Sequence, residues 1–334
     1  MRNESIFEAM AKDINNSNLS AADKQRMMTN LAAMRSQKMN IMITGATGCG
    51  KSSTINALFD SNMAKVGEGA DPETMTIEKY EYGNLILWDS PGLGDGAEND
   101  VRHSKNIIRK LHERDENGNL LIDLVLVILD GGSRDLGTSY DLINNVIIPN
   151  LGEERDKRIL VAINQADVAM KGKYWNYEEH RPEPRLEEFL AQKAESVKNR
   201  IFEATGVSVE PICYSAGYTE DGVQEPPYNL NKLLMYIILH TPCAKRVLLT
   251  DPINPSKENF RYDDALRDYN EEVRKSLGES IRDGLTEGVS VGSDIGGAIG
   301  GLFGKGGEAV GRAVGGFIGG AVGAIGGFIS GLFG

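Results

Sequence analysis

Eight consecutive residues near the start of the chain restrict its fold more than any other feature. They fit the pattern G-x-x-x-x-G-K-[S/T] and read Gly45, Ala46, Thr47, Gly48, Cys49, Gly50, Lys51 and Ser52. An apolar run at 39–44 precedes them, and a helix-like run at 52–59 follows. A strand, a glycine-rich turn and a helix in this order form a phosphate-binding loop, because backbone N–H groups at the helix start converge on anions.

The parts of this loop have distinct expected roles. Gly45 and Gly50 permit a close approach of the backbone that a Cβ atom would block. Lys51 is expected to reach the β- and γ-phosphates of a nucleotide, and the Ser52 hydroxyl to ligate Mg²⁺. We therefore predict that residues 45–52, with Ser53 in the first helical turn, bind a nucleotide.

Composition and charge limit the partners and the cellular compartment that we expect for the chain. The chain has 334 residues and a net charge of −12, which argues against DNA binding, since such proteins usually present a basic face. Its three cysteines show neither paired nor metal-ligand spacing. The first 38 residues lack the apolar core of a signal peptide. We expect a protein of the reducing cytoplasm.

From residue 39 to residue 241, strand-like and helix-like runs alternate, which predicts an α/β domain with a mostly parallel sheet and helices on both faces. The expected strands are 40–44, 77–82, 85–89, 121–129, 158–164 and 209–214, with 77–82 as an antiparallel edge. The expected helices are 50–59, 99–112, 139–150, 185–204 and 230–240.

A second motif, Asp89-Ser90-Pro91-Gly92, closes an expected strand and fits D-x-x-G. Ligands bind beyond the carboxyl ends of the strands in such sheets, so its position favours a role in the site. An aspartate at position 89 can hold Mg²⁺, usually through water. The Gly92 amide is expected to contact the γ-phosphate.

Two further motifs concern the base. Asn164-Gln165-Ala166-Asp167 follows an expected strand and is similar to N-K-x-D, in which the aspartate accepts two hydrogen bonds from guanine. Adenine has no such donor pair, so Asp167 predicts a guanine nucleotide. Ser215-Ala216-Gly217 follows the last expected strand and can direct a backbone amide at the guanine oxygen. The nucleotide-binding candidates here are Asn164, Gln165, Asp167, Ser215 and Ala216.

With these motifs in order, residues 39–241 resemble the translation-factor-related class of GTPases, most of all the Era/Der-like branch and the prophage "GTPase family" proteins. The resemblance implies a Ras-like fold that binds GTP or GDP with Mg²⁺. It also implies a Mg²⁺-ligating threonine in the first switch, for which Thr74 and Thr76 are the candidates and the spacing favours Thr74. The expected Mg²⁺ ligands are thus Ser52, Thr74 and Asp89.

Two positions depart from the family pattern. Gln165 replaces the lysine that lies over the base and braces the phosphate loop, which predicts weaker nucleotide binding with unchanged base choice. Leu93 stands where Ras-like enzymes carry the glutamine that orients water, so we expect slow intrinsic hydrolysis. Asp95, a backbone group of a switch, or a partner must then position the water. The candidate catalytic residues are Lys51, Thr74, Gly92 and Asp95.

The remaining segments form three expected parts. Residues 1–38 read as two helices, with Ser20 as the cap of the second. They are expected to form either a collar on the nucleotide domain or a partner-binding or dimer-forming arm. Residues 242–283 read as a linker followed by a charged helix. Residues 284–334 contain 20 of the 39 glycines of the chain.

In this last segment a glycine recurs at every fourth position, from 284 to 304 and, after a three-residue step, from 307 to 331, with bulky apolar residues between. No charge occurs from 313 to 334, a length of 22 residues that can span an apolar core of about 30 Å as a helix. The pattern resembles the glycine zippers of membrane-inserting proteins, in which small residues let helices approach closely. A flexible linker and a soluble helical hairpin are the alternatives.

These features predict a Mg²⁺-dependent GTPase whose nucleotide state controls a membrane-associating tail at the inner face of a membrane. Self-association through the GTPase domain or the tail is expected. A ribosome-associated assembly GTPase is the first alternative, although the chain shows no basic RNA-binding module. A nucleotide-gated soluble scaffold is the second.

Overall fold

The computed structural model describes residues 5–16, 20–60, 65–67, 77–94, 96–220 and 223–286. These residues form two compact units. The larger unit comprises 39–241 and 252–267, and the smaller one contains the described residues of 1–38, 242–251 and 268–334. The stretch 242–283, expected to be a linker and a charged helix, is thus divided between the two units.

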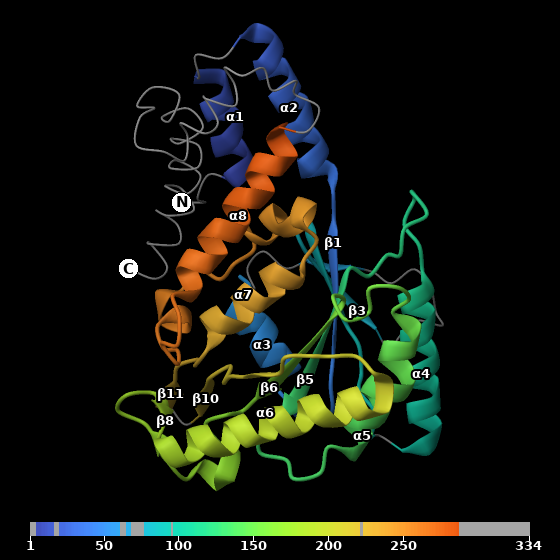
Figure 1. Cartoon of the computed structure of the whole chain (residues 1–334), viewed down its shortest axis with the longest axis vertical. Coiled ribbons are helices and arrows are strands. Elements are labelled where there is room, and N and C mark those ends of the chain that lie inside the picture. The colour runs from blue at the N-terminus through green and yellow to red at the C-terminus, as the bar shows by residue number, and fades with distance from the viewer. Residues whose placement is uncertain are drawn as a thin grey trace. The chain divides into compact units, whose positions relative to one another are not determined.

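A seven-stranded sheet forms the centre of the larger unit (Figure 1). Its strands, in spatial order, are β2 (Lys65–Gly67), β3 (Glu78–Tyr82), β4 (Leu85–Asp89), β1 (Met39–Thr44), β5 (Leu124–Asp130), β6 (Ile159–Asn164) and β9 (Ile212–Cys213). From β4 to β9 neighbouring strands are parallel, whereas β3 is antiparallel to β4 and β2 to β3. The predicted mostly parallel sheet is confirmed, with β2 as an additional edge strand.

Strands β1 and β6 are buried along their whole length, as is β5 up to its last residue. Such near-continuous apolar runs are typical of parallel strands covered on both faces. The register pairs Ile43 with Asp89 and Asp130 with Asn164, so these strands end side by side. One edge of the sheet therefore collects the loops that follow β1, β4, β5 and β6.

Helices cover both faces of this sheet. They are α3 (Lys51–Leu58), α4 (Ala97–His112), α5 (Gly137–Asp141), α6 (Pro184–Thr205) and α7 (Leu230–His240). Figure 1 shows α3 and α7 together on one face, with α4, α5 and α6 on the other. After α5 the helix changes to a π-helical turn, η3 (Leu142–Ile147), and then to a 3₁₀ turn, η4 (Ile148–Asn150).

Smaller elements lie in the loops of the larger unit. They are η5 (Ala169–Gly172), the pair β7 (Trp175–Asn176) and β8 (Arg181–Pro182), the pair β10 (Tyr218–Glu220) and β11 (Val223–Glu225), and η7 (Lys257–Phe260). The segment 252–267 is fixed to α3, because the Asn254 side-chain amide donates to Asn56 O at 2.8 Å and that of Asn259 donates to Ala57 O at 2.9 Å.

Two expected strands are shorter in the structure. The strand predicted from residue 121 begins at Leu124. The residue before it, Asp123, is the last of the preceding loop, and its carboxylate accepts a hydrogen bond from the Asn40 amide at 2.9 Å. The strand predicted over 209–214 is restricted to Ile212–Cys213. Pro211 precedes it and has no N–H group for a ladder hydrogen bond.

The smaller unit is helical. Its elements are α1 (Ile6–Asn16), α2 (Ala21–Ser36), η6 (Cys243–Leu249) and α8 (Tyr269–Thr286). As predicted, Ser20 caps α2, with its hydroxyl oxygen accepting the Asp23 amide at 3.1 Å. The buried stripe of Met27, Leu31 and Met34 holds α2 against its neighbours.

None of the described helices combines the length and the apolar character needed to cross a membrane. Residues 287–334, which make up nearly all of the predicted glycine-zipper tail, lie outside the described residues. The first glycine of the tail register, Gly284, is described and lies in the last turn of α8. A Cβ atom at Gly284 would lie 2.5 Å from Met34 Sδ on α2, so the two helices approach closely at this point.

The Gly284→Leu variant should destabilise the smaller unit by about 1–3 kcal/mol, because the added side chain overlaps Met34. The matched control is Asp283→Leu, which adds a leucine at the exposed neighbouring position and should change stability by less than about 0.5 kcal/mol. Urea unfolding followed by circular dichroism measures both. A further Met34→Ala substitution should restore part of the loss, whereas equal stability of the two leucine variants would contradict the close packing.

Candidate nucleotide-binding site

The predicted phosphate-binding loop occupies the turn between β1 and α3. Gly50 has a φ angle of 87°, in the left-handed region that favours glycine, and a Cβ atom there would overlap the Asn164 side chain. A Cβ atom at Gly45 would overlap the carbonyl oxygen of Ile128 on β5. The two glycines of the motif are therefore required by close approaches to the neighbouring strands.

Lys51 begins α3, and its side chain folds back over the loop. Its Nζ atom donates to Gly45 O at 2.9 Å and to Ala46 O at 3.4 Å. Thr47 and Gly48 at the tip of the loop are exposed, as are Ser52 and Ser53 in the first helical turn, whereas Cys49 is buried. The exposed tip and the start of α3 leave the concave side of the loop open to a phosphate group.

The buried Asn164 side chain joins three loops of the site. Its Nδ2 atom donates to Cys49 O in the phosphate loop at 2.9 Å. Its Oδ1 atom accepts the Ala216 amide at 2.9 Å. Asn164 thus ties the phosphate loop to the loop after β9, and Asp167, three residues later, accepts a hydrogen bond from Ser215 of the latter loop.

Gln165 makes the brace that its lysine counterpart supplies in the family pattern. Its Nε2 atom donates to Gly48 O at 2.8 Å, and its backbone has a φ angle of 62°. The expected loss of bracing is therefore offset by a neutral amide hydrogen bond. The loss of the positive charge remains, because glutamine is uncharged.

Asp167 is almost fully buried, with 3% of its surface exposed. Burial raises the pKa of its carboxyl above the ordinary value, and a hydrogen bond from the Ser215 hydroxyl acts in the opposite direction. Ser215 is itself fixed, since it exchanges two backbone hydrogen bonds of 3.0 Å with Tyr228. A buried carboxylate with a fixed neighbour suits a ligand that brings two N–H donors.

Asp89 ends β4 next to the phosphate loop. Burial raises the pKa of its carboxyl to about 6, with Lys51 lowering it and Glu78 raising it further. Its Oδ1 atom is buried and finds no hydrogen-bond partner among the described residues. A buried oxygen of this kind calls for an explanation, and a cation or an ordered water is the usual one.

The donor set at this point fits Mg²⁺. Carboxylate and hydroxyl oxygens are the ligands that Mg²⁺ prefers, and Asp89 and Ser52 supply one of each. When bound, the ion would neutralise phosphate charge. The third expected ligand, Thr74, and its alternative Thr76 lie outside the described residues, as does Asp95. Among the described residues no cluster of three or more His, Cys, Asp or Glu side chains forms a metal site by itself.

The turn after β4 lies directly on the phosphate loop. A Cβ atom at Gly92 would overlap Gly45 O, so only glycine fits at this close approach. Leu93, the next residue, packs against the apolar core and cannot orient water. We therefore still expect the group that positions the attacking water to be Asp95, a backbone group of a switch, or a partner.

Two contacts of the site had no sequence signal. The buried His103 on α4 lies 3.2 Å from Gly92 O through Nδ1, which must carry the proton because a carbonyl only accepts. The Thr54 hydroxyl donates to Gly50 O at 2.8 Å and lies 2.6 Å from the Tyr214 hydroxyl. Thr54 and Tyr214 are 160 residues apart, so only the fold shows that they meet.

Comparison with known proteins agrees with this geometry. Residues 40–165 match the family model described as 50S ribosome-binding GTPase. The chain is 26% identical over 173 residues to the uncharacterized protein YfjP of Escherichia coli (strain K12), covering 51% of this chain and 55% of that protein. It is 32% identical over 133 residues to the tRNA modification GTPase MnmE of Sulfurovum sp. (strain NBC37-1), covering 39% and 27%.

Among solved structures, Aquifex aeolicus Era bound to GDP and AlF4⁻ is 19% identical, with a TM-score of 0.36 over 62% of this chain and 57% of that one. The chain spans about half the length of YfjP and 27% of MnmE. Motifs, fold and family match together define the class: the chain carries a P-loop GTPase domain with the Ras-like fold.

The raised pKa of Asp89 has a consequence for stability. Between the ordinary pKa near 4 and the folded value of about 6, the folded protein retains a proton that the unfolded chain has lost. Without nucleotide or Mg²⁺, stability should therefore fall as pH rises through this window. The Asp89→Asn variant should lack this part of the slope and unfold at a higher urea concentration than the wild type at pH 7. Identical pH slopes of wild type and variant would contradict the buried state of Asp89.

Proposed function

We propose that the protein is a Mg²⁺-dependent GTP hydrolase whose nucleotide state controls association of its glycine-rich tail with a membrane. The observation that carries the first half is the Asn164 side chain, which is hydrogen-bonded to both the phosphate loop and the Ala216 loop. Because Asp167 follows three residues later, the group that reads the base is linked mechanically to the loop that holds the phosphates.

The rate of hydrolysis is proposed to be slow in the isolated chain. Leu93 packs into the core in place of a water-orienting glutamine. A group supplied by a partner, or by a second copy of the chain, can raise the rate of phosphoryl transfer by about 10³–10⁵. Self-association through the GTPase domain or the tail would bring such a group to the site.

The second half of the proposal rests on the sequence of residues 284–334. Glycine at this density disfavours a helix in water by about 1 kcal/mol per residue relative to alanine, whereas lipid enforces a helix. The close approach of Gly284 to Met34 supports the use of this register for tight packing. The proposed location is the cytoplasmic face of a membrane, either peripheral or inserted.

A ribosome-associated assembly GTPase is the second candidate. The observation that favours it is the family match, whose description names 50S ribosome binding, together with the proposed kinship to Era/Der-like and prophage GTPases. The net charge of −12 stands against it, because RNA binding depends largely on cationic contacts with phosphates. Co-sedimentation with ribosomal particles at moderate salt would favour this candidate.

Flotation with liposomes tests the membrane proposal. The full chain should float with phosphatidylcholine–phosphatidylglycerol vesicles to different extents in GTP and GDP, because the nucleotide controls exposure of the tail. A chain that ends at Thr286 retains all of α8 and should remain at the bottom of the gradient. The Lys51→Ala variant, which lacks the phosphate-contacting ammonium, should show no difference between the nucleotides.

Equal flotation of the full and shortened chains would contradict the proposal. Oligomers that form without lipid and disappear with the tail would replace it with the soluble scaffold. Light scattering without detergent, on the same two chains, distinguishes these outcomes.

A further inference from the structure

A cavity of about 730 Å³ lies in the larger unit, outside the nucleotide site. Its walls are the loop after β5, the turn around η5 and one face of α6. None of its lining residues belongs to the phosphate loop or to the motifs that begin at Asp89, Asn164 and Ser215. Its volume lies in the range typical of small-molecule sites.

The cavity is lined by cations. Six basic residues and one carboxylate, that of Asp135, contribute to its walls, in a chain whose net charge is −12. The basic residues are Arg134, Lys171, Lys173, Arg185, Lys193 and Arg200. Within the described part of the chain, none of the six forms an ion pair with a carboxylate. A concave surface with one sign of charge concentrates the field and attracts a counter-ion.

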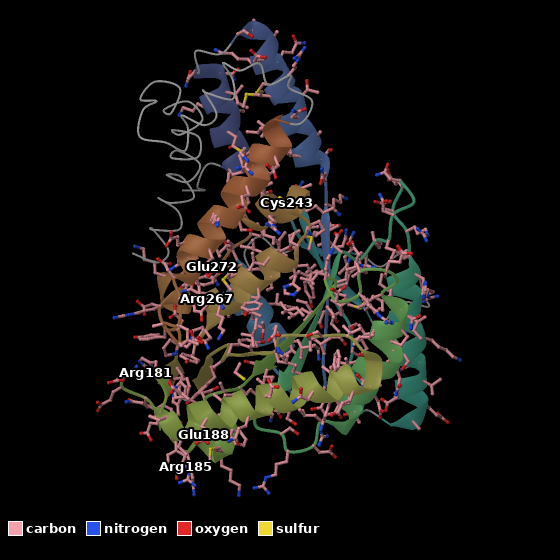
Figure 2. All side chains as sticks on the ribbon, viewed as in Figure 1. Arg181, Arg185, Glu188, Cys243, Arg267 and Glu272 are labelled. Carbon is pink, nitrogen blue, oxygen red and sulfur yellow. The ribbon has the colours of Figure 1, made fainter. Side chains whose placement is uncertain are left out.

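Two of the arginines are held over aromatic rings. Arg185, which Figure 2 labels at the start of α6, donates from Nη1 to the Tyr174 hydroxyl at 2.7 Å, and its guanidinium lies 4.8 Å from the Tyr174 ring centre. The Arg200 guanidinium lies 5.4 Å from the Tyr140 ring centre. Stacking of this kind orients the guanidinium and leaves most of its N–H donors for an anion.

Lys193, also on α6, joins this helix to the wall formed by the loop after β5. Its Nζ atom donates to the carbonyl oxygens of Asp130, Gly131 and Ser133, at 3.2, 2.7 and 2.7 Å. These contacts occupy its three donors, so Lys193 gives the cavity charge rather than hydrogen bonds. It also fixes the loop that carries Arg134.

The turn around η5 presents the remaining cations in a constrained backbone. Met170, Lys171 and Tyr174 have φ angles of 53°, 64° and 66°, a region that side-chain-bearing residues rarely adopt. Hydrogen bonds from the Gly172 amide to Val168 O at 3.1 Å and from the Glu183 amide to Tyr174 O at 2.8 Å hold this conformation. Lys171, Lys173 and Tyr174 all line the cavity as a result.

We propose that this cavity binds a soluble small molecule that carries two or more phosphate groups. Phosphate oxygens match the fork of donors on Arg185 and Arg200, and the six cations outnumber the carboxylates of Asp135 and of Asp130, which acts on Lys193. Apolar residues such as Leu136, Phe189 and Val197 also line the cavity and can contact the rest of the ligand. The cations surround one open concavity of limited volume, which fits a small ligand better than a nucleic-acid strand.

Calorimetric titration of inorganic tripolyphosphate into the full chain tests the proposal. The chain is first saturated with GDP and Mg²⁺, which blocks the phosphate loop. One tripolyphosphate should bind per chain, more weakly as salt is added. The Arg185→Ala/Arg200→Ala variant should bind at least about tenfold more weakly, because two charge-assisted contacts are lost.

Lys198→Ala is the matched control. Lys198 lies on α6 between these arginines in sequence, but it pairs with Glu210 at 2.5 Å and does not line the cavity. This variant should bind tripolyphosphate within about twofold of the wild type. GDP affinity should be unchanged in all variants, which verifies their folding.

Three results would overturn the proposal. They are absence of binding at millimolar tripolyphosphate, equal weakening by Lys198→Ala, and displacement of tripolyphosphate by additional GDP. Phosphatidylcholine vesicles containing phosphatidic acid form a separate arm. Binding of these vesicles that depends on Arg185 and Arg200, without binding of tripolyphosphate, would assign the cavity to a lipid headgroup and refute a soluble ligand.

Discussion

The hydrogen bonds of Asn164 are the constraint on which the nucleotide site depends. Its amide nitrogen donates to Cys49 O, and its amide oxygen accepts from the Ala216 amide. Both bonds are buried, where an unpaired partner would be left without water. The close approach of Asn164 to Gly50 then explains why that position must be glycine. One side chain therefore fixes the relative positions of the two loops that we propose to hold the phosphates and the base.

The electrostatics of the site point to a ligand that completes it. Burial raises the pKa of both Asp89 and Asp167. A buried carboxylate is unfavourable without enough donors or a cation, and Asp89 has an oxygen without a partner among the described residues, whereas Asp167 accepts from the Ser215 hydroxyl. Guanine N–H groups suit Asp167, and the orphaned oxygen of Asp89 suits a hydrated cation.

Much of the fold followed from the sequence because the strands have strong signals. The strands β1, β5 and β6 are continuous apolar runs, and the motifs follow their carboxyl ends. Strand β2 was missed, because a three-residue edge strand leaves little pattern to detect. The π-helical turn after α5 was read as ordinary helix, since its residues keep nearly the same apolar spacing.

The site was predictable in its motifs but not in its cross-contacts. The motifs that contain Lys51 and Asp89 are local patterns, and their roles toward phosphate and Mg²⁺ stay predictions. The contacts of Thr54 with Tyr214 and of His103 with Gly92 depend on the fold, which alone brings these residues together. The cationic cavity is a similar case, because its six basic residues come from three separate segments, each of which has an unremarkable charge pattern by itself. At Gln165 the sequence predicted a lost contact that the structure restores. The glutamine replaces the lysine of the family pattern, but its side chain still donates a hydrogen bond to Gly48 O in the phosphate loop.

The central claim is that Asp167 selects guanine and that Asn164 fixes this selection relative to the phosphate loop. Binding of GDP and of xanthosine diphosphate, each with Mg²⁺, to wild type and to Asp167→Asn tests it most directly. The variant should lose at least about tenfold in GDP affinity and gain xanthosine diphosphate binding, because the asparagine amide donates where aspartate only accepts, and xanthine has a carbonyl oxygen where guanine has its amino group. Unchanged preference for GDP in the variant would show that Asp167 does not select the base.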